Sequence, residues 1–185
     1  MKNLKLVALA LIITVTFTSC SNDDNPAPVN EEEVITTVRV TLTGGGQVVT
    51  MTSRDLDGDG PNAPTVTVSG NLIANTTYTG AVEFLNELET PAGNITEEVE
   101  EEGADHQVFY QANAALGTFT YSDTDANGKP IGVAFSYISG NAASGNLTVT
   151  LRHLPNKSAA GVASGDITNA GGATDAEVSF PVVVN

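Results

Sequence analysis

Alternation of apolar and polar residues runs through most of the chain after residue 33. In the first such stretch, Val34 to Leu42, every second residue is apolar or β-branched. A period of two is typical of a β-strand that buries one face. Glycines at 44–46 lead into a second alternating stretch at about 47–54. Two such stretches joined by a glycine turn predict a β-hairpin.

Similar stretches recur along the rest of the chain, at the spacing expected for a sandwich or barrel. They cover residues 65–68, 78–84, 107–111, 117–121, 132–138, 145–154 and 177–184. The composition is rich in Thr, Val, Gly and Asn and has no Trp, which suits strands and their turns. We therefore expect an all-β, Ig-like antiparallel β-sandwich of about eight to nine strands. An up-and-down β-barrel is the alternative.

Residues 91–105 break the period of two and predict one short acidic helical insertion. Asn94 or Thr96 can cap a helix whose first turn carries Glu97 and Glu98. Acidic side chains in a first turn suit the positive end of the helix dipole. Gly103 is expected to end or weaken the helix.

The N-terminal residues differ from the rest of the chain. An apolar run from Leu6 to Phe17 follows Lys2 and Lys5 and ends at Cys20, the lone cysteine. This pattern predicts a signal peptide over residues 1–19. Residues 20–33 contain prolines and acids without an apolar pattern, so they are expected to form a flexible tether. Residues 34–185 then form the β-sandwich domain.

The residues around Cys20 resemble the lipobox of bacterial lipoproteins, in which a small residue precedes the lipidated cysteine. Ser21-Asn22-Asp23-Asp24 resembles the short acidic export signal of surface lipoproteins in Bacteroidota-type bacteria. The resemblance implies cleavage before Cys20 and anchorage in the outer membrane by lipid chains, facing the cell exterior. With Cys20 lipidated, no cysteine is left for a disulfide.

Leu72 and Tyr78, six residues apart, resemble the tyrosine corner of fibronectin type III and related sandwiches. In such a corner the phenol hydroxyl bonds to the backbone a few residues upstream. Ala74 stands where a proline is usual. The resemblance covers about seven residues and favours an Ig-like sandwich.

Charge and missing motifs exclude several functions. The formal net charge is −15, which repels nucleic acid and anionic lipid headgroups. The chain has no G-x-S-x-G elbow and no H-E-x-x-H motif, and its glycine-rich stretches lack the strand–helix context of a phosphate loop. We therefore expect a binding protein and not an enzyme.

Two loops share the pattern D-x-[DN]-x-[DN]-G, which resembles the first half of an EF-hand loop. Their candidate calcium ligands are Asp55, Asp57 and Asp59 in one loop, and Asp123, Asp125 and Asn127 in the other. Alternating oxygens in a turn can converge on one hard cation. Neither loop has the Glu of the twelfth position, and turns favour Asp, Asn and Gly without any metal. Calcium sites and ordinary turns both remain open.

The two histidines give a second metal hypothesis. Glu98, Glu102 and His106 are four residues apart, and a Glu–His pair at this spacing can chelate zinc or copper if one helix carries both. His153 follows Leu151 on the inward face of its predicted strand. If the acidic insertion folds over that strand end, Glu102, His106 and His153 can share one zinc or copper ion. The alternatives are a solvated acidic face and a buried core histidine.

These observations favour a lipid-anchored, surface-exposed binding protein that captures a divalent metal ion or assists an uptake receptor in the outer membrane. The alternative is a structural or adhesive surface module without a small-molecule ligand.

Overall fold

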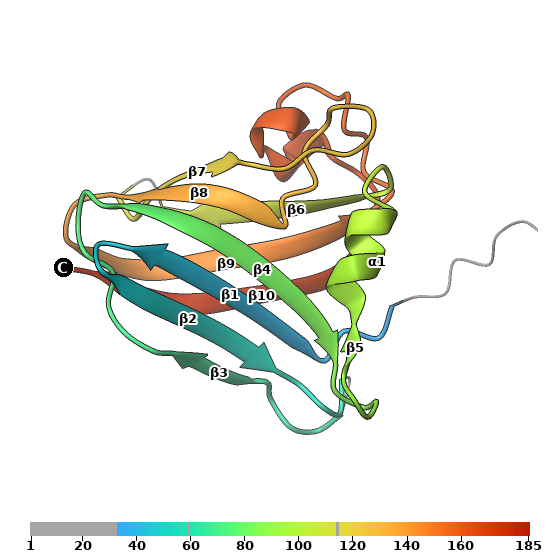
Figure 1. Ribbon diagram of the computed structural model, residues 1–185, viewed down its shortest axis with the longest axis horizontal. Coiled ribbons are helices and arrows are strands. Elements are labelled where there is room, and N and C mark those ends of the chain that lie inside the picture. The colour runs from blue at the N-terminus through green and yellow to red at the C-terminus, as the bar shows by residue number, and fades with distance from the viewer. Residues whose placement is uncertain (1–32, 59, 114) are drawn as a thin grey trace, which may run out of the picture. The chain divides into compact units, whose positions relative to one another are not determined.

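Residues 33–185, except 59 and 114, are described by a computed structural model of the chain (Figure 1). They fall within one structural unit, Glu32–Asn185. The predicted signal peptide, Cys20, the tether up to residue 32 and Asp59 lie outside the described residues. No helix in the described part of the chain is long and apolar enough to cross a membrane.

Two antiparallel sheets make up the described part (Figure 1). The larger sheet contains β1 (Thr37–Gly44), β2 (Gln47–Arg54), β3 (Thr65–Val68), β4 (Thr77–Asn86), β5 (Gly93–Asn94), β7 (Gly117–Tyr121) and β8 (Ala134–Ser139). The smaller sheet contains β6 (His106–Ala112), β9 (Ala143–His153) and β10 (Ala173–Val184). The strand orders are β3-β2-β1-β4-β8-β7, with β5 paired to β4, and β10-β9-β6.

Residues from both sheets form one hydrophobic core between them. Val40 and Phe84 of the larger sheet and Val108, Leu151 and Phe180 of the smaller sheet are fully buried in it. Among the described strands, β6 and β7 do not pair, so the sheets do not close into a barrel. The prediction of an all-β antiparallel sandwich is confirmed. The two-residue strand β5 is the addition to the nine predicted stretches.

The predicted glycine hairpin joins β1 to β2. Gly44 pairs with Gln47, which leaves Gly45 and Gly46 as a two-residue turn. Both turn residues have positive φ, 58° and 76°. Two-residue hairpin turns with positive φ at both positions match the twist of the strands. Glycine adopts a positive φ readily because it has no Cβ.

Tyr78 ties the start of β4 to the segment before it. Its hydroxyl accepts a hydrogen bond of 2.8 Å from the backbone N–H of Ile73, five residues upstream. The neighbouring Leu72 forms an isolated parallel bridge with Val184 at the end of β10. This segment therefore links the edge of the smaller sheet to the start of the central strand β4.

Helix α1 (Ile95–Glu101) is the predicted acidic insertion, and it is only seven residues long. Glu102 is the C-terminal capping position, so the helix does not continue to His106. A Cβ at Gly103 would lie 2.6 Å from the Ile131 side chain, and this close packing explains the glycine at the turn. The single helix face hypothesised for Glu98, Glu102 and His106 is therefore absent. A turn leads directly into β6 instead.

Residues 154–172 cover the outer face of the smaller sheet with two short 3₁₀ helices, Val162–Ser164 and Ile167–Asn169. Phe109 points into this cover and packs against Val162 and Ala170. Gln107 donates a 2.9 Å hydrogen bond to the carbonyl oxygen of Val162. The smaller sheet is thus buried on both faces near the start of β6.

Candidate metal centre

The sheet register brings the two histidines together. His106 opens β6 and His153 ends β9, and the two residues are direct partners in the antiparallel ladder. Directly paired side chains on one face lie within contact distance. The ring centroids are 4.7 Å apart, with the rings perpendicular. Both side chains face inward at the end of the sandwich, 0% and 9% exposed, as the strand pattern predicts for His153.

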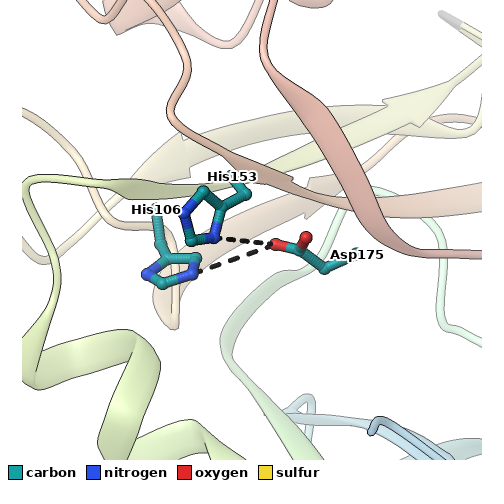
Figure 2. Close-up of side chains that lie close together, drawn as sticks. All are labelled: His106, His153 and Asp175. Carbon is teal, nitrogen blue, oxygen red and sulfur yellow. Dashed lines mark ion pairs between the residues drawn. The ribbon is translucent and has the colours of Figure 1, made fainter. Parts of the chain in front are cut away.

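Asp175 reaches the histidines through a β-bulge in β10. This strand pairs regularly with β9 up to Thr174 and again from Ala176, so Asp175 is the extra residue. Bulges re-aim side chains and occur often near functional sites. Asp175 Oδ2 lies 3.8 Å from His153 Nδ1 and 3.9 Å from His106 Nε2 (Figure 2).

The backbone fixes which nitrogen of His106 faces this carboxylate. His106 Nδ1 lies 3.2 Å from the carbonyl oxygen of Glu102. A carbonyl can only accept, so Nδ1 carries the proton. Whenever the ring is neutral, it therefore presents the Nε2 lone pair to the cluster. Histidines that bind metals usually donate their other N–H to a carbonyl or carboxylate in this way.

Glu33 and Glu102 extend the cluster. Glu33 Oε1 lies 3.3 Å from His106 Nε2, and the Glu33 side chain is largely buried. Two overlapping groups have ligand atoms within 4.8 Å of one another: His106 with His153 and Asp175, and His106 with Glu33 and Glu102. His106 belongs to both groups, so it is the central residue of the cluster.

The spacing of these atoms suits one ion. Zinc binds imidazole nitrogen and carboxylate oxygen at about 2.0–2.2 Å, which separates neighbouring ligand atoms by about 3.3–3.6 Å at tetrahedral angles. The observed separations from His106 Nε2 are 3.3 Å to Glu33 and 3.9 Å to Asp175. The first lies within this range and the second is slightly longer. An ion held by His106, His153 and Asp175 would form one nitrogen–oxygen group, and Glu33, which shares no group with His153 or Asp175, would have to move to join it.

The electrostatics of the cluster favour a positive charge. Burial lowers the pKa of His106, but the Glu33 carboxylate, the Glu102 carbonyl and the Asp175 carboxylate together raise it above its usual value. Partial burial and the carboxylates of Glu33 and Glu102 raise the pKa of Glu98. Carboxylates crowd this end of the sandwich, and a bound cation would relieve their repulsion.

Of the three residues predicted from sequence as zinc or copper ligands, His106 lies in one group with His153 and in a separate group with Glu102, and Glu102 and His153 share no group. Two further members of the cluster were missed. Asp175 lies in a stretch where the bulge hides the alternation, and Glu33 lies in the predicted tether. No local sequence signal marks either residue as a ligand.

The first aspartate-rich loop is held by hydrogen bonds within itself. Asp55 Oδ1 accepts from the backbone N–H groups of Asp57 and Gly58, at 3.3 and 3.0 Å. Asp57 Oδ2 accepts from Asn62, at 2.7 Å from its side-chain amide. The Asn62 side-chain hydrogen bond is the main cause that lowers the pKa of Asp57. These contacts are those of an aspartate-stabilised turn.

The second loop uses its carboxylates to fix the β7–β8 connection. Asp123 accepts from the N–H groups of Gly132 and Ala134, at 2.7 and 2.8 Å. Asp125 Oδ1 accepts from the N–H groups of Asn127 and Lys129, at 2.8 and 2.9 Å. Among the described residues, neither loop contributes to a group of carboxylates and histidines that could hold a metal. The structure therefore gives these carboxylates a role in the turns.

A separate concavity lies between the unpaired edges of β6 and β7. Its volume is about 430 Å³, and Tyr110, Phe119, Tyr121 and Ser164 line part of it. The Tyr110 and Phe119 rings are stacked 5.1 Å apart. The lining includes neither histidine and no charged side chain, so it is distinct from the metal centre.

Comparison with protein-family models, with curated proteins and with solved structures found no significant match to this chain.

Proposed function

We propose that this chain is a lipid-anchored protein of the outer membrane, displayed on the cell surface, whose sandwich domain binds a divalent transition-metal ion. The binding residues are His106, His153 and Asp175. One observation carries the proposal: two inward-facing histidines and a bulge-borne carboxylate converge at the end of the smaller sheet. The role is capture of the ion, with delivery to an uptake receptor in the same membrane.

The donor set selects the class of metal. Imidazole nitrogens suit zinc, copper and nickel, whereas calcium and magnesium prefer oxygen alone. Two imidazoles and carboxylates therefore favour Zn²⁺ or Cu²⁺ over Ca²⁺. Cys20 lies outside the domain, so the domain has no thiolate for a soft ion such as Cu⁺.

Three protein ligands are typical of a site whose remaining position stays open, while structural zinc sites are closed by four. An open position allows the ion to be exchanged. This property suits capture and delivery better than permanent structural binding. We propose binding without catalysis.

Metal binding is tested by isothermal titration of the metal-stripped full chain, in detergent, with zinc and then copper. We expect binding of one ion, weakened at least about tenfold in His153→Ala and in His106→Gln. Asp57→Ala is the control, because it removes a carboxylate that belongs to neither ligand group. Equal affinity in all four proteins would contradict the assignment of the centre. The absence of any binding would contradict the proposed function.

Anchorage is tested separately in cells. Labelling with a radioactive fatty acid should modify the wild-type chain and not Cys20→Ala. Proteinase added to intact cells should degrade the anchored chain if it faces the exterior. Protection from the protease would place the chain on the inner leaflet instead.

A further inference from the structure

The N-terminal segment contributes to the centre through Glu33, and this inference rests on the proposed function. Glu33 lies four residues before the start of β1. Its carboxylate nevertheless folds inward, with a side chain only 11% exposed. Oε1 lies 3.3 Å from His106 Nε2. Oε2 is buried and has no hydrogen-bond partner among the described residues.

Burying the Glu33 carboxylate costs free energy unless a cation lies close to it. A buried carboxylate needs a partner of opposite charge or several hydrogen bonds. Among the described residues, His106 is the one basic side chain within ion-pair distance of Glu33. Glu98 and Glu102 add like charge nearby. A proton on His106 would serve Oε1 of Glu33, but it would leave the buried Oε2 atom without a hydrogen-bond partner among the described residues. A metal ion bound to His106 Nε2 would supply the buried carboxylate with the opposite charge it needs.

We propose that Glu33 is the fourth ligand of this ion, that its side chain shifts from its separate group with Glu102 and His106 to reach the ion, and that metal binding fastens residues 33–36 to the end of the sandwich. The other three ligands stand on β6, β9 and β10, which are joined by continuous hydrogen-bonded ladders. Glu33 stands on a segment outside every strand. It is therefore the ligand that can leave without disturbing the sheet.

The consequence is a site that closes and opens through one residue. With Glu33 bound, four protein ligands hold the ion, as in closed zinc sites. With Glu33 displaced, three ligands remain and one position is free for an acceptor. In the proposed lipoprotein the same segment leads to the lipid anchor. Displacement of Glu33 would therefore change how tightly the ion is held.

The test compares Glu33→Gln with Glu98→Gln in the full chain in detergent. Both variants remove one negative charge from the same neighbourhood, but Glu98 belongs to neither ligand group. We expect Glu33→Gln to weaken zinc binding by about tenfold or more and to speed zinc transfer to a chelator. Glu98→Gln should stay within about threefold of the wild type, because it removes only a nearby charge.

A second readout follows the segment itself. A protease that cuts after glutamate should cleave the metal-free chain after Glu33, and zinc should slow this cleavage in the wild type. Equal zinc affinities and equal transfer rates in the two variants would overturn the role of Glu33 while leaving the proposed function intact. A wild-type chain that binds no zinc or copper would instead overturn the proposed function.

Discussion

Lys157 and Asp125 form an ion pair of 3.0 Å in which both side chains are almost fully buried. The lysine Nζ also donates to the carbonyl oxygens of Gly103 and Pro130. The three donors of the ammonium group are thus all used. The pair joins the β7–β8 loop to the turn between α1 and β6, next to Glu102 of the candidate metal centre. A loop that resembles a calcium site in sequence serves here to hold the acidic insertion in place.

Lys157→Met should destabilise the domain strongly. The substitution keeps the apolar stem but leaves the buried Asp125 carboxylate and two carbonyl groups without their cation. Removing one partner of a buried ion pair costs about 3–5 kcal/mol. Asp125 keeps two backbone donors, so we expect a loss near the lower end, measured by urea unfolding. Lys129→Met is the matched control and should change the free energy of unfolding by less than about 0.5 kcal/mol.

Asp125→Asn should make the free energy of unfolding depend less on pH in the acidic range. Burial raises the pKa of Asp125, but the Lys129 N–H, the Lys157 ammonium group and the Asn127 N–H outweigh it and hold the pKa below its usual value. The folded state therefore binds fewer protons than the unfolded state between the two pKa values. The contribution of Asp125 is present above its unfolded pKa and is lost as the pH falls through its folded pKa.

Urea unfolding at pH 7 and at pH 3 measures this effect. The wild type should lose more stability than Asp125→Asn between the two values, while other carboxylates act equally in both proteins. Parallel profiles would show that Asp125 is not stabilised as an anion.

Gly80→Ala should destabilise the central part of the larger sheet. Gly80 pairs with Phe135 across β4 and β8. A Cβ at this position would lie 2.3 Å from the Phe135 ring, which is buried in the core. Overpacking of this kind costs about 1–3 kcal/mol. Gly70→Ala is the control, because a Cβ there meets nothing within 4 Å. Similar unfolding midpoints for the two variants would contradict the packing described here.

Local patterns predict the strands because a half-buried strand must alternate. The same rule places His153 on the inner face beside Leu151. It cannot predict that His106 is the direct partner of His153, because register depends on the whole sheet. The position of Asp175 is harder still to predict, because a bulge breaks the alternation that would show which way its side chain points.

In the aspartate-rich loops a sequence motif is present, but the motif alone does not say whether the loop binds a metal. Asp123 and Asp125 match the start of a calcium loop, yet their oxygens accept hydrogen bonds from the backbone. The same residue types suit a metal loop and a tight turn, and only the positions of the surrounding N–H groups distinguish them. The position of Glu33 beside His106 is also beyond local reasoning, because it depends on how the residues before β1 meet the end of the sheet.

X-ray absorption at the zinc edge of the zinc-loaded full chain tests the central claim most directly. It reports the atoms bound to the ion, independently of affinity or stability. The account predicts a first shell at about 2.0–2.1 Å that contains two imidazole nitrogens together with carboxylate oxygens. The imidazole signal should fall by half in His153→Ala. A shell of oxygen atoms alone would contradict the account and would place the ion on the surface carboxylates.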